Sequence, residues 1–209
     1  MKPRLIAFDF DGTIADTLGE VHRIFNELAP EFGLQEIHAD DVPKLRQLTV
    51  NGLLRELGVS KRQAPALLTK GLSILRTRIE NIELIEGMKE AITTLRPRVD
   101  HLGILTSNTA ENVELFLKHH GLEEPFDFIS SKSKLSGKAK HLKSILRTFS
   151  LEKEDMLYVG DELRDVKACK KAGIPIAAVI WGFNAKEALA KSEPEFLVSQ
   201  PQQLVELLS

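Results

Sequence analysis

The chain has little that would suit a secreted, membrane-bound or nucleic-acid-binding protein. Its 209 residues include one cysteine, Cys169, which excludes an internal disulfide framework and a zinc site built from cysteines. No apolar stretch approaches the length of a membrane span, and the apolar run that ends at Asp9 is too short for a signal peptide. The net charge of −2 lacks the basic excess of a protein that binds nucleic acid or an anionic membrane. We therefore expect a soluble, cytoplasmic protein with no nucleic-acid or membrane partner, and its oligomeric state stays open.

A buried strand is predicted near the start, where apolar residues run directly into two acids. Residues 5–8 form a continuous apolar run that is typical of a strand buried on both faces, and Asp9, Asp11 and Gly12 follow it. Residues i and i+2 of an extended chain point the same way, so both carboxylates are expected at the strand's carboxyl end. They repel each other unless a cation lies between them. The alternative interpretation is an ordinary Asp/Gly turn, and this motif by itself does not decide between the two.

The rest of the chain divides into a helical block and an alternating region. Apolar residues recur at helical spacing in three stretches, 20–28, 40–57 and 60–79, with Ser60 as the expected N-cap of the third. Beyond Val99, strands are expected at 102–106, 126–129, 156–159, 175–180 and 196–198, with helices between them and Asn184 capping a helix at 185–190. This alternation predicts an α/β fold with a Rossmann-like, mostly parallel sheet and helices on both faces.

The helical block interrupts this sheet after its first strand. We therefore predict an α/β core of residues 1–15 and 84–209, and an all-helical cap of residues 16–83. Ligands of open α/β sheets bind outside the carboxyl ends of the strands. The cap is thus expected to cover the place where Asp9 and Asp11 project.

Three further clusters of polar residues are expected at or beyond strand ends. Ser107 and Asn108 follow the strand at 102–106 and could hold phosphate oxygens, although both are also common helix caps. Lys138 opens a predicted helix, where a cation is unfavourable unless an anion binds nearby; a solvated surface lysine is the alternative. Asp161 and Asp165 lie four residues apart and so share one face of a helix start, where acids are favoured in any case.

The four clusters together resemble the motifs of the haloacid dehalogenase-like hydrolase superfamily. Asp9-Phe10-Asp11-Gly12-Thr13 is similar to its first motif, Ser107 to its second, Lys138 to its third, and Gly160-Asp161 with Asp165 to its fourth. The order is the same, and the match spans essentially the whole chain. The helical block resembles the small cap of the phosphoglycolate-phosphatase-like branch, and the segments 161–165 and 181–184 are similar to that branch as well.

The resemblance implies a Mg²⁺-dependent phosphatase that acts on a small phosphorylated metabolite of the phosphoglycolate-like class. Asp9 would be the nucleophile that forms an aspartyl-phosphate, because a carboxylate is ionised at neutral pH and can attack phosphorus directly. Asp11 would serve as general acid and base, and Ser107 and Lys138 would stabilise the transferring phosphoryl group. The expected metal site comprises Asp9, Asp11 through its main-chain carbonyl, Asp161 and, more distantly, Asp165. The residues expected to contact substrate or its phosphate are Gly12, Thr13, Ser107, Asn108, Lys138 and the cap residue Arg46.

Other functions remain open at this point. A phosphomutase of the same superfamily would use the same motifs, but it would return the phosphoryl group to a bound sugar phosphate. A phospho-accepting signalling module or a catalytically silent binding module would be alternatives of a different class. The sequence does not specify the substrate, because specificity is expected to depend on the cap. The cap contains the cation Arg46, which belongs to none of the four motifs.

Overall fold

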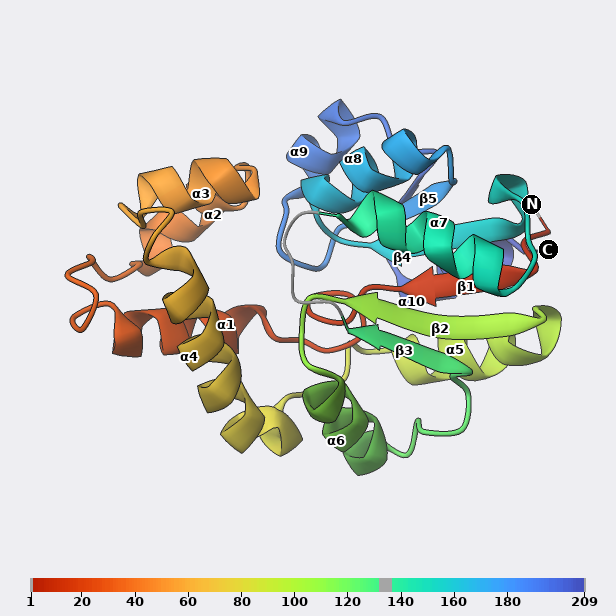
Figure 1. Cartoon of the computed structure of the whole chain (residues 1–209), viewed down its shortest axis with the longest axis horizontal. Coiled ribbons are helices and arrows are strands. Elements are labelled where there is room, and N and C mark those ends of the chain that lie inside the picture. The colour runs from red at the N-terminus through yellow and green to blue at the C-terminus, as the bar shows by residue number, and fades with distance from the viewer. Residues whose placement is uncertain (1, 132–136, 209) are drawn as a thin grey trace.

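The computed structural model of the chain, which describes residues 2–131 and 137–208, contains one six-stranded parallel sheet (Figure 1). The strand order is β3-β2-β1-β4-β5-β6, so the first strand lies in the middle of the sheet. The strands are β1 (Leu5–Phe8), β2 (His101–Thr106), β3 (Phe128–Ser131), β4 (Met156–Gly160), β5 (Ile176–Val179) and β6 (Phe196–Val198). The carboxyl ends of these strands point to one edge of the sheet, because all five pairings are parallel.

The two faces of the sheet carry separate hydrophobic cores. In β1, Ile6 and Phe8 face one core while Leu5 and Ala7 face the other, as the two-residue period of a strand requires. The first core packs against α5 (Met88–Leu95), α6 (Ala110–His120) and α10 (Pro201–Glu206). The second packs against α7 (Lys138–Thr148), α8 (Leu163–Ala172) and α9 (Lys186–Lys191) (Figure 1). The predicted fold, a parallel sheet covered by helices on both faces, is confirmed.

A block of helices lies between β1 and β2 in the sequence and beside the sheet in space (Figure 1). It consists of α1 (Leu18–Leu28), α2 (Val42–Leu45), α3 (Val50–Glu56) and α4 (Ala64–Arg78), and we call it the helical cap. The chain enters and leaves the cap through two adjacent segments: Ala15 pairs with Leu84, and the Asp16 N–H donates to the Glu83 carbonyl at 2.9 Å. This pairing falls at the boundaries expected from the sequence, and the division into two domains stays a prediction.

Some element boundaries differ from those expected. The predicted helical stretch 40–57 is broken between α2 and α3, because the Thr49 hydroxyl accepts the Gly52 N–H and so caps a new helix. Helix α4 begins at Ala64 with Gln63 as its N-cap residue, whereas the sequence predicted Ser60 in that position. Strand β3 lies two residues later than predicted, since the Asp127 carboxylate accepts the Leu102 N–H beside the strand. Within the described residues, no helix is long and apolar enough to cross a membrane.

Candidate active site

Asp9 lies directly beyond the carboxyl end of β1 and is almost completely buried. Its Oδ1 accepts the Phe10 N–H at 2.8 Å, which fixes the carboxylate at the strand end. The backbone then turns through Gly12, whose φ is +72°. A Cβ atom at this glycine would lie 2.5 Å from Asp161 Oδ2, so glycine is required both by the left-handed backbone and by the close approach of the two segments.

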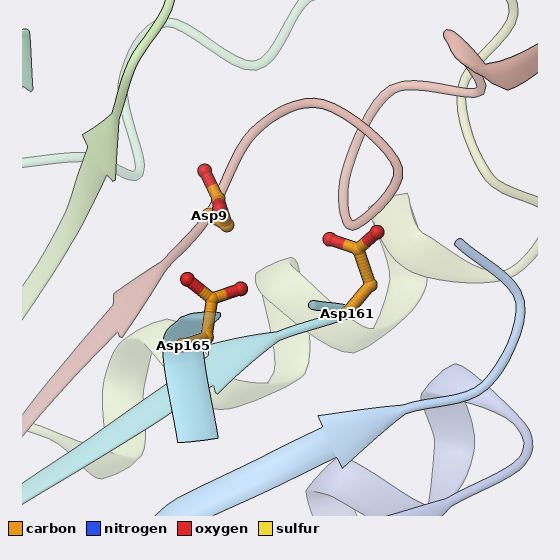
Figure 2. Close-up of side chains that lie close together, drawn as sticks. All are labelled: Asp9, Asp161 and Asp165. Atoms are coloured by element: carbon orange, nitrogen blue, oxygen red, sulfur yellow. The ribbon is translucent and has the colours of Figure 1, made fainter. Parts of the chain in front are cut away.

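Three carboxylates from three places in the chain meet beyond the sheet. Asp9 follows β1, Asp161 follows β4, and Asp165 lies in the first turn of α8 (Figure 2). One oxygen from each can be chosen so that all lie within 4.8 Å of one another, and all three residues are buried. Carboxylate oxygens at this spacing suit a hard divalent cation such as Mg²⁺. These three acids belong to the metal site that the resemblance implies, and the structure brings them together.

The negative charges of this cluster lie close together and away from water, which makes them unfavourable. Burial raises the pKa of Asp161 well above its ordinary value, and the neighbouring carboxylates of Glu162, Asp9 and Asp165 raise it further. Two donors oppose this effect: the Thr13 hydroxyl donates to Asp161 Oδ1 at 2.8 Å, and the Phe183 N–H donates to Oδ2 at 2.6 Å. A divalent cation at this position would relieve the repulsion, and the residues present therefore fit a metal site.

Lys138 supplies a positive charge inside the cluster. Its Nζ donates to Asp9 Oδ2 at 2.6 Å and to Asp165 Oδ1 at 2.5 Å, and it lies 5.0 Å from the centre of the Tyr158 ring. Burial lowers the pKa of Lys138, but Asp165 and Asp9 more than offset this, so the ammonium stays charged. The second oxygen of Asp165 accepts the Glu162 N–H at 3.1 Å. Both Asp165 oxygens thus have partners within the protein, as do those of Asp9 and Asp161, and the supporting position expected for Asp165 stays a prediction.

Asp11 lies beside Asp9 and receives a donor from the loop after β2. The Asn108 amide nitrogen lies 3.1 Å from each oxygen of the Asp11 carboxyl group. Burial raises the pKa of Asp11 to about 6, and the Asp9 carboxylate raises it too, whereas the hydrogen bond from Asn108 lowers it. A carboxyl group with such a pKa can both donate and accept a proton near neutral pH. Asn108 is 1% exposed and donates to Asp11, and its expected contact with substrate phosphate stays a prediction.

Ser107 has a cationic neighbour that the sequence analysis did not identify. Arg164 Nη2 lies 3.3 Å from the Ser107 hydroxyl, and the same atom lies 2.5 Å from Glu162 Oε1. Glu162 and Arg164 are both largely buried side chains of the segment that carries Asp161 and Asp165. Glu162 and Arg164 lie between Asp161 and Asp165 in the sequence, and these two opposite charges were the available signal of a cation at the site. It did not stand out, because such pairs are common on solvated helix faces.

Thr13 supports the site in a way that differs from its expected role. Thr13 is 0% exposed, and its hydroxyl donates a hydrogen bond to Asp161. Its main-chain carbonyl accepts the Trp181 Nε1–H at 3.2 Å from the loop after β5. This hydroxyl therefore orients a carboxylate of the cluster, and the expected contact between Thr13 and substrate stays a prediction.

Arg46, the expected substrate residue of the cap, contacts main-chain carbonyls of the core. Its Nη2 donates to the Gly182 carbonyl at 2.7 Å and to the Ile180 carbonyl at 3.4 Å, and its Nε donates to Phe183 at 3.3 Å. Asn184 completes this junction: its Nδ2 donates to the carbonyls of Arg46 and Leu48 at 2.9 and 3.0 Å. The guanidinium thus joins the cap to the loop after β5, and the Phe183 N–H of this loop donates to Asp161. Its contact with substrate stays a prediction.

Asn184 is also a case in which a local expectation is wrong. The sequence predicted that Asn184 caps the following helix, but the N-cap residue of α9 is Ala185. The Asn184 side chain instead accepts the Leu163 N–H at 2.8 Å and so supports the start of α8. One side chain thus bridges the cap and the helix that carries Asp165.

Comparison with known proteins places this geometry in a family. The family model described as haloacid dehalogenase-like hydrolase matches residues 6–179. The phosphoglycolate phosphatase of Synechococcus elongatus is 34% identical over 204 residues, covering 98% of this chain and 96% of that protein. The pyrophosphatase PpaX of Bacillus cereus is 24% identical over 213 residues, covering 100% of this chain and 98% of that protein.

A solved structure shows the same fold. The chain is similar to a haloacid dehalogenase-like family hydrolase from Streptococcus pneumoniae, with a TM-score of 0.84 and 21% identity. The match covers 100% of this chain and 99% of that one. The fold is therefore shared over the whole length with a protein of distant sequence.

Proposed function

The chain belongs to the haloacid dehalogenase-like hydrolases and is a phosphatase of the phosphoglycolate-phosphatase-like branch, and we propose that it hydrolyses a small phosphorylated metabolite through an aspartyl-phosphate on Asp9. The observation that carries this proposal is the position of Asp9. Its carboxylate lies at the carboxyl end of the central strand, with Lys138 on one of its oxygens and the Asp11 carboxyl group two residues away.

In the first step a carboxylate oxygen of Asp9 attacks the phosphorus of the substrate. A bond forms between this oxygen and phosphorus while the bond from phosphorus to the ester oxygen breaks. Asp11 gives its proton to the departing alkoxide, so that the first product leaves with a neutral hydroxyl group. The raised pKa of Asp11, about 6, supports this role because a useful fraction of the carboxyl group carries a proton.

In the second step a water molecule attacks the phosphorus of the aspartyl-phosphate. Asp11, now ionised, accepts a proton from this water as the new phosphorus–oxygen bond forms. The bond between phosphorus and Asp9 breaks, and Asp9 returns to a carboxylate as inorganic phosphate leaves. The Asn108 amide favours the ionised form of Asp11 at this stage, since it donates to the carboxylate.

The cations of the site would neutralise the charge of the transferring group. Lys138 is held between Asp9 and Asp165, where its ammonium can donate to phosphoryl oxygens. The Ser107 hydroxyl, with Arg164 behind it, offers a second donor at the neighbouring strand end. Gly12 lets the main chain pass close to Asp161, because a side chain there would collide with this carboxylate. We propose that the same main-chain segment lies beside the phosphate.

We propose that Mg²⁺ is held by Asp9, the main-chain carbonyl of Asp11 and Asp161, with Asp165 in support. The three buried carboxylates supply hard oxygen ligands, and a divalent cation would reduce the repulsion that raises the pKa of Asp161. When bound, Mg²⁺ would supply positive charge beside the phosphoryl oxygens. The protein's own contribution is orientation: Thr13 and the Phe183 N–H hold the Asp161 oxygens in place.

Two substrate classes follow from the relatives. The Synechococcus elongatus protein is named a phosphoglycolate phosphatase and the Bacillus cereus protein a pyrophosphatase. We propose the phosphoglycolate class, because its representative is the more similar of the two and covers nearly the whole chain. Residues 16–83 would act as the cap domain that selects the substrate, and the cell compartment is expected to be the cytoplasm.

A phosphate-release screen tests this function. The purified chain with Mg²⁺ is offered 2-phosphoglycolate, pyrophosphate, several sugar phosphates and p-nitrophenyl phosphate. We expect free phosphate from 2-phosphoglycolate at the highest kcat/KM. Highest activity on pyrophosphate would select the second class. Conversion of a sugar phosphate to its isomer, without net phosphate release, would indicate a phosphomutase.

A further inference from the structure

A buried asparagine of α6, Asn112, belongs to a chain of hydrogen bonds that ends on Asp11. Asn112 is 1% exposed. Its Nδ2 donates to Asn108 Oδ1 at 2.9 Å and to the Leu72 carbonyl of the cap helix α4 at 3.3 Å. Asn108 in turn donates from its own Nδ2 to the Asp11 carboxyl group. The chain therefore connects the cap, α6 and the loop after β2 with Asp11.

The orientation of the Asn108 amide is decided by two donors. Its Oδ1 accepts the Thr109 N–H at 2.8 Å as well as the Asn112 amide. Two donors require an oxygen at this end of the amide, so the nitrogen must face Asp11. Asn112 cannot be reversed either, because its oxygen would then face two acceptors, Asn108 Oδ1 and the Leu72 carbonyl.

Fold stability does not account for an asparagine at position 112. The Asn112 Oδ1 atom is buried and has no hydrogen-bond partner in the described part of the chain. A buried acceptor without a partner destabilises the folded state, and an apolar side chain of similar size would avoid this. The neighbouring positions Val113, Phe116 and Leu117 of the same helix are buried and apolar, which shows that apolar residues suit this layer.

We propose that Asn112 is a positioning residue for the phosphatase reaction, which fixes Asn108 so that Asp11 is oriented to protonate the leaving group. The inference rests on the proposed role of Asp11. Without Asn112, the Asn108 amide would lose one of the two donors that hold it, and the Asp11 carboxyl group would sample orientations that do not face the ester oxygen. Proton transfer would become slower, whereas substrate binding, which depends on other groups, would be retained.

Asn112→Leu tests this role, with steady-state kinetics on two substrates and thermal unfolding as readouts. We expect kcat on 2-phosphoglycolate to fall about tenfold or more, with little change in KM, because small misplacements of catalytic groups cost about this much or more. The loss in kcat/KM on p-nitrophenyl phosphate should be much smaller than on 2-phosphoglycolate, since nitrophenolate leaves without a proton and kcat/KM does not include the second step, which is common to both substrates. The melting temperature should equal or exceed that of the wild type. Asn112→Ala serves as a second variant if the leucine does not pack.

A double-variant comparison tests the route of the effect. Asn108→Ala should lower kcat, and adding Asn112→Leu should lower it no further, because Asn112 acts through Asn108. Glu114→Gln, on the exposed side of the same helix, is the matched control and should behave as the wild type. The inference would be overturned by a wild-type kcat in both Asn112 variants, by equal losses in kcat/KM on both substrates, or by additive losses in the double variant. If Asp11→Asn were as active as the wild type, the proposed function of Asp11 would fail instead.

Discussion

Lys138 Nζ lies 2.6 Å from Asp9 Oδ2, although the two residues are 129 positions apart in the chain. The Lys138 side chain is 13% exposed and that of Asp9 2%, so the pair is formed away from bulk water. The nucleophile proposed for this phosphatase is therefore held by a cation at the first position of α7. Several measurable consequences follow from this arrangement and from the surrounding groups.

Asp9→Asn should abolish phosphate release while the protein stays folded. The amide has nearly the shape of the carboxylate and can still accept the Phe10 N–H, but it is not a nucleophile. The measurement is phosphate release from 2-phosphoglycolate in the presence of Mg²⁺, with circular dichroism to verify folding. Asp100→Asn, which alters an exposed ion pair with Arg4, is the control and should remain fully active. A tenth of the wild-type rate in Asp9→Asn would rule out Asp9 as the nucleophile.

Lys138→Met should destabilise the fold as well as stop turnover. Removing one partner of a buried ion pair leaves unpaired charges on Asp9 and Asp165, which costs about 3–5 kcal/mol in comparable cases. Urea unfolding of the metal-free protein at neutral pH measures this change in the free energy of unfolding. Lys140→Met, at an exposed position of the same helix, should change it by less than about 0.5 kcal/mol. Equal stabilities of the two variants would show that the Lys138 pairs contribute nothing to folding.

Asp11→Asn should stabilise the metal-free protein at neutral pH. The pKa of Asp11 is raised from 3.8 to about 6 in the folded state, so the folded chain binds this proton more tightly than the unfolded chain does. Stability contributed by Asp11 is therefore lost as the pH rises from 3.8 to about 6. The asparagine does not titrate. The melting temperature of the Asp11→Asn protein minus that of the wild type should therefore increase as the pH rises across this window. Thermal unfolding in EDTA at several pH values measures it, and a constant difference would contradict the shifted pKa.

Mg²⁺ should raise the melting temperature of the wild type, and Asp161→Asn should weaken this effect. Binding to the folded state alone adds about 2.7 kcal/mol at a hundredfold excess of metal over its Kd. In EDTA, Asp161→Asn should melt higher than the wild type, because burial and neighbouring acids make the Asp161 charge unfavourable. The two opposite effects of one substitution distinguish loss of a metal ligand from general damage to the fold. Full activity in excess EDTA would argue against metal dependence.

Arg46→Ala separates the two roles open to this residue. As a substrate ligand, Arg46 would be needed for 2-phosphoglycolate and not for p-nitrophenyl phosphate, so its loss would raise KM for the first substrate only. As a junction between the cap and the carbonyls of residues 180, 182 and 183, it would affect both substrates alike and lower thermal stability. The structure supports the second outcome. Arg55→Ala, on the cap helix α3, is the matched control for loss of a cap arginine.

The linear order of motifs could be predicted because it depends on local patterns. A continuous apolar run, a turn glycine and the alternation of strands with helices identify the sheet and its carboxyl edge without any knowledge of distant contacts. The resemblance of these patterns to the superfamily's motifs implied a metal site with Asp9, Asp161 and Asp165, and the structure places one oxygen of each within 4.8 Å of the others. The interruption of the sheet by a helical block was equally visible, since residues 16–83 carry helical spacing and no strand pattern.

What a polar side chain contacts at that edge was decided only by the tertiary structure. Thr13 reaches Asp161 across 148 positions, Asn108 reaches Asp11 across 97, and Arg46 reaches Gly182 across 136. Threonine, asparagine and arginine can each serve a ligand, a helix cap or another side chain, and the sequence around them does not distinguish these uses. Which partner each side chain binds depends on how elements from distant parts of the chain pack against one another. The sequence thus determined which strand ends carry the chemistry, and packing determined which partner each side chain holds.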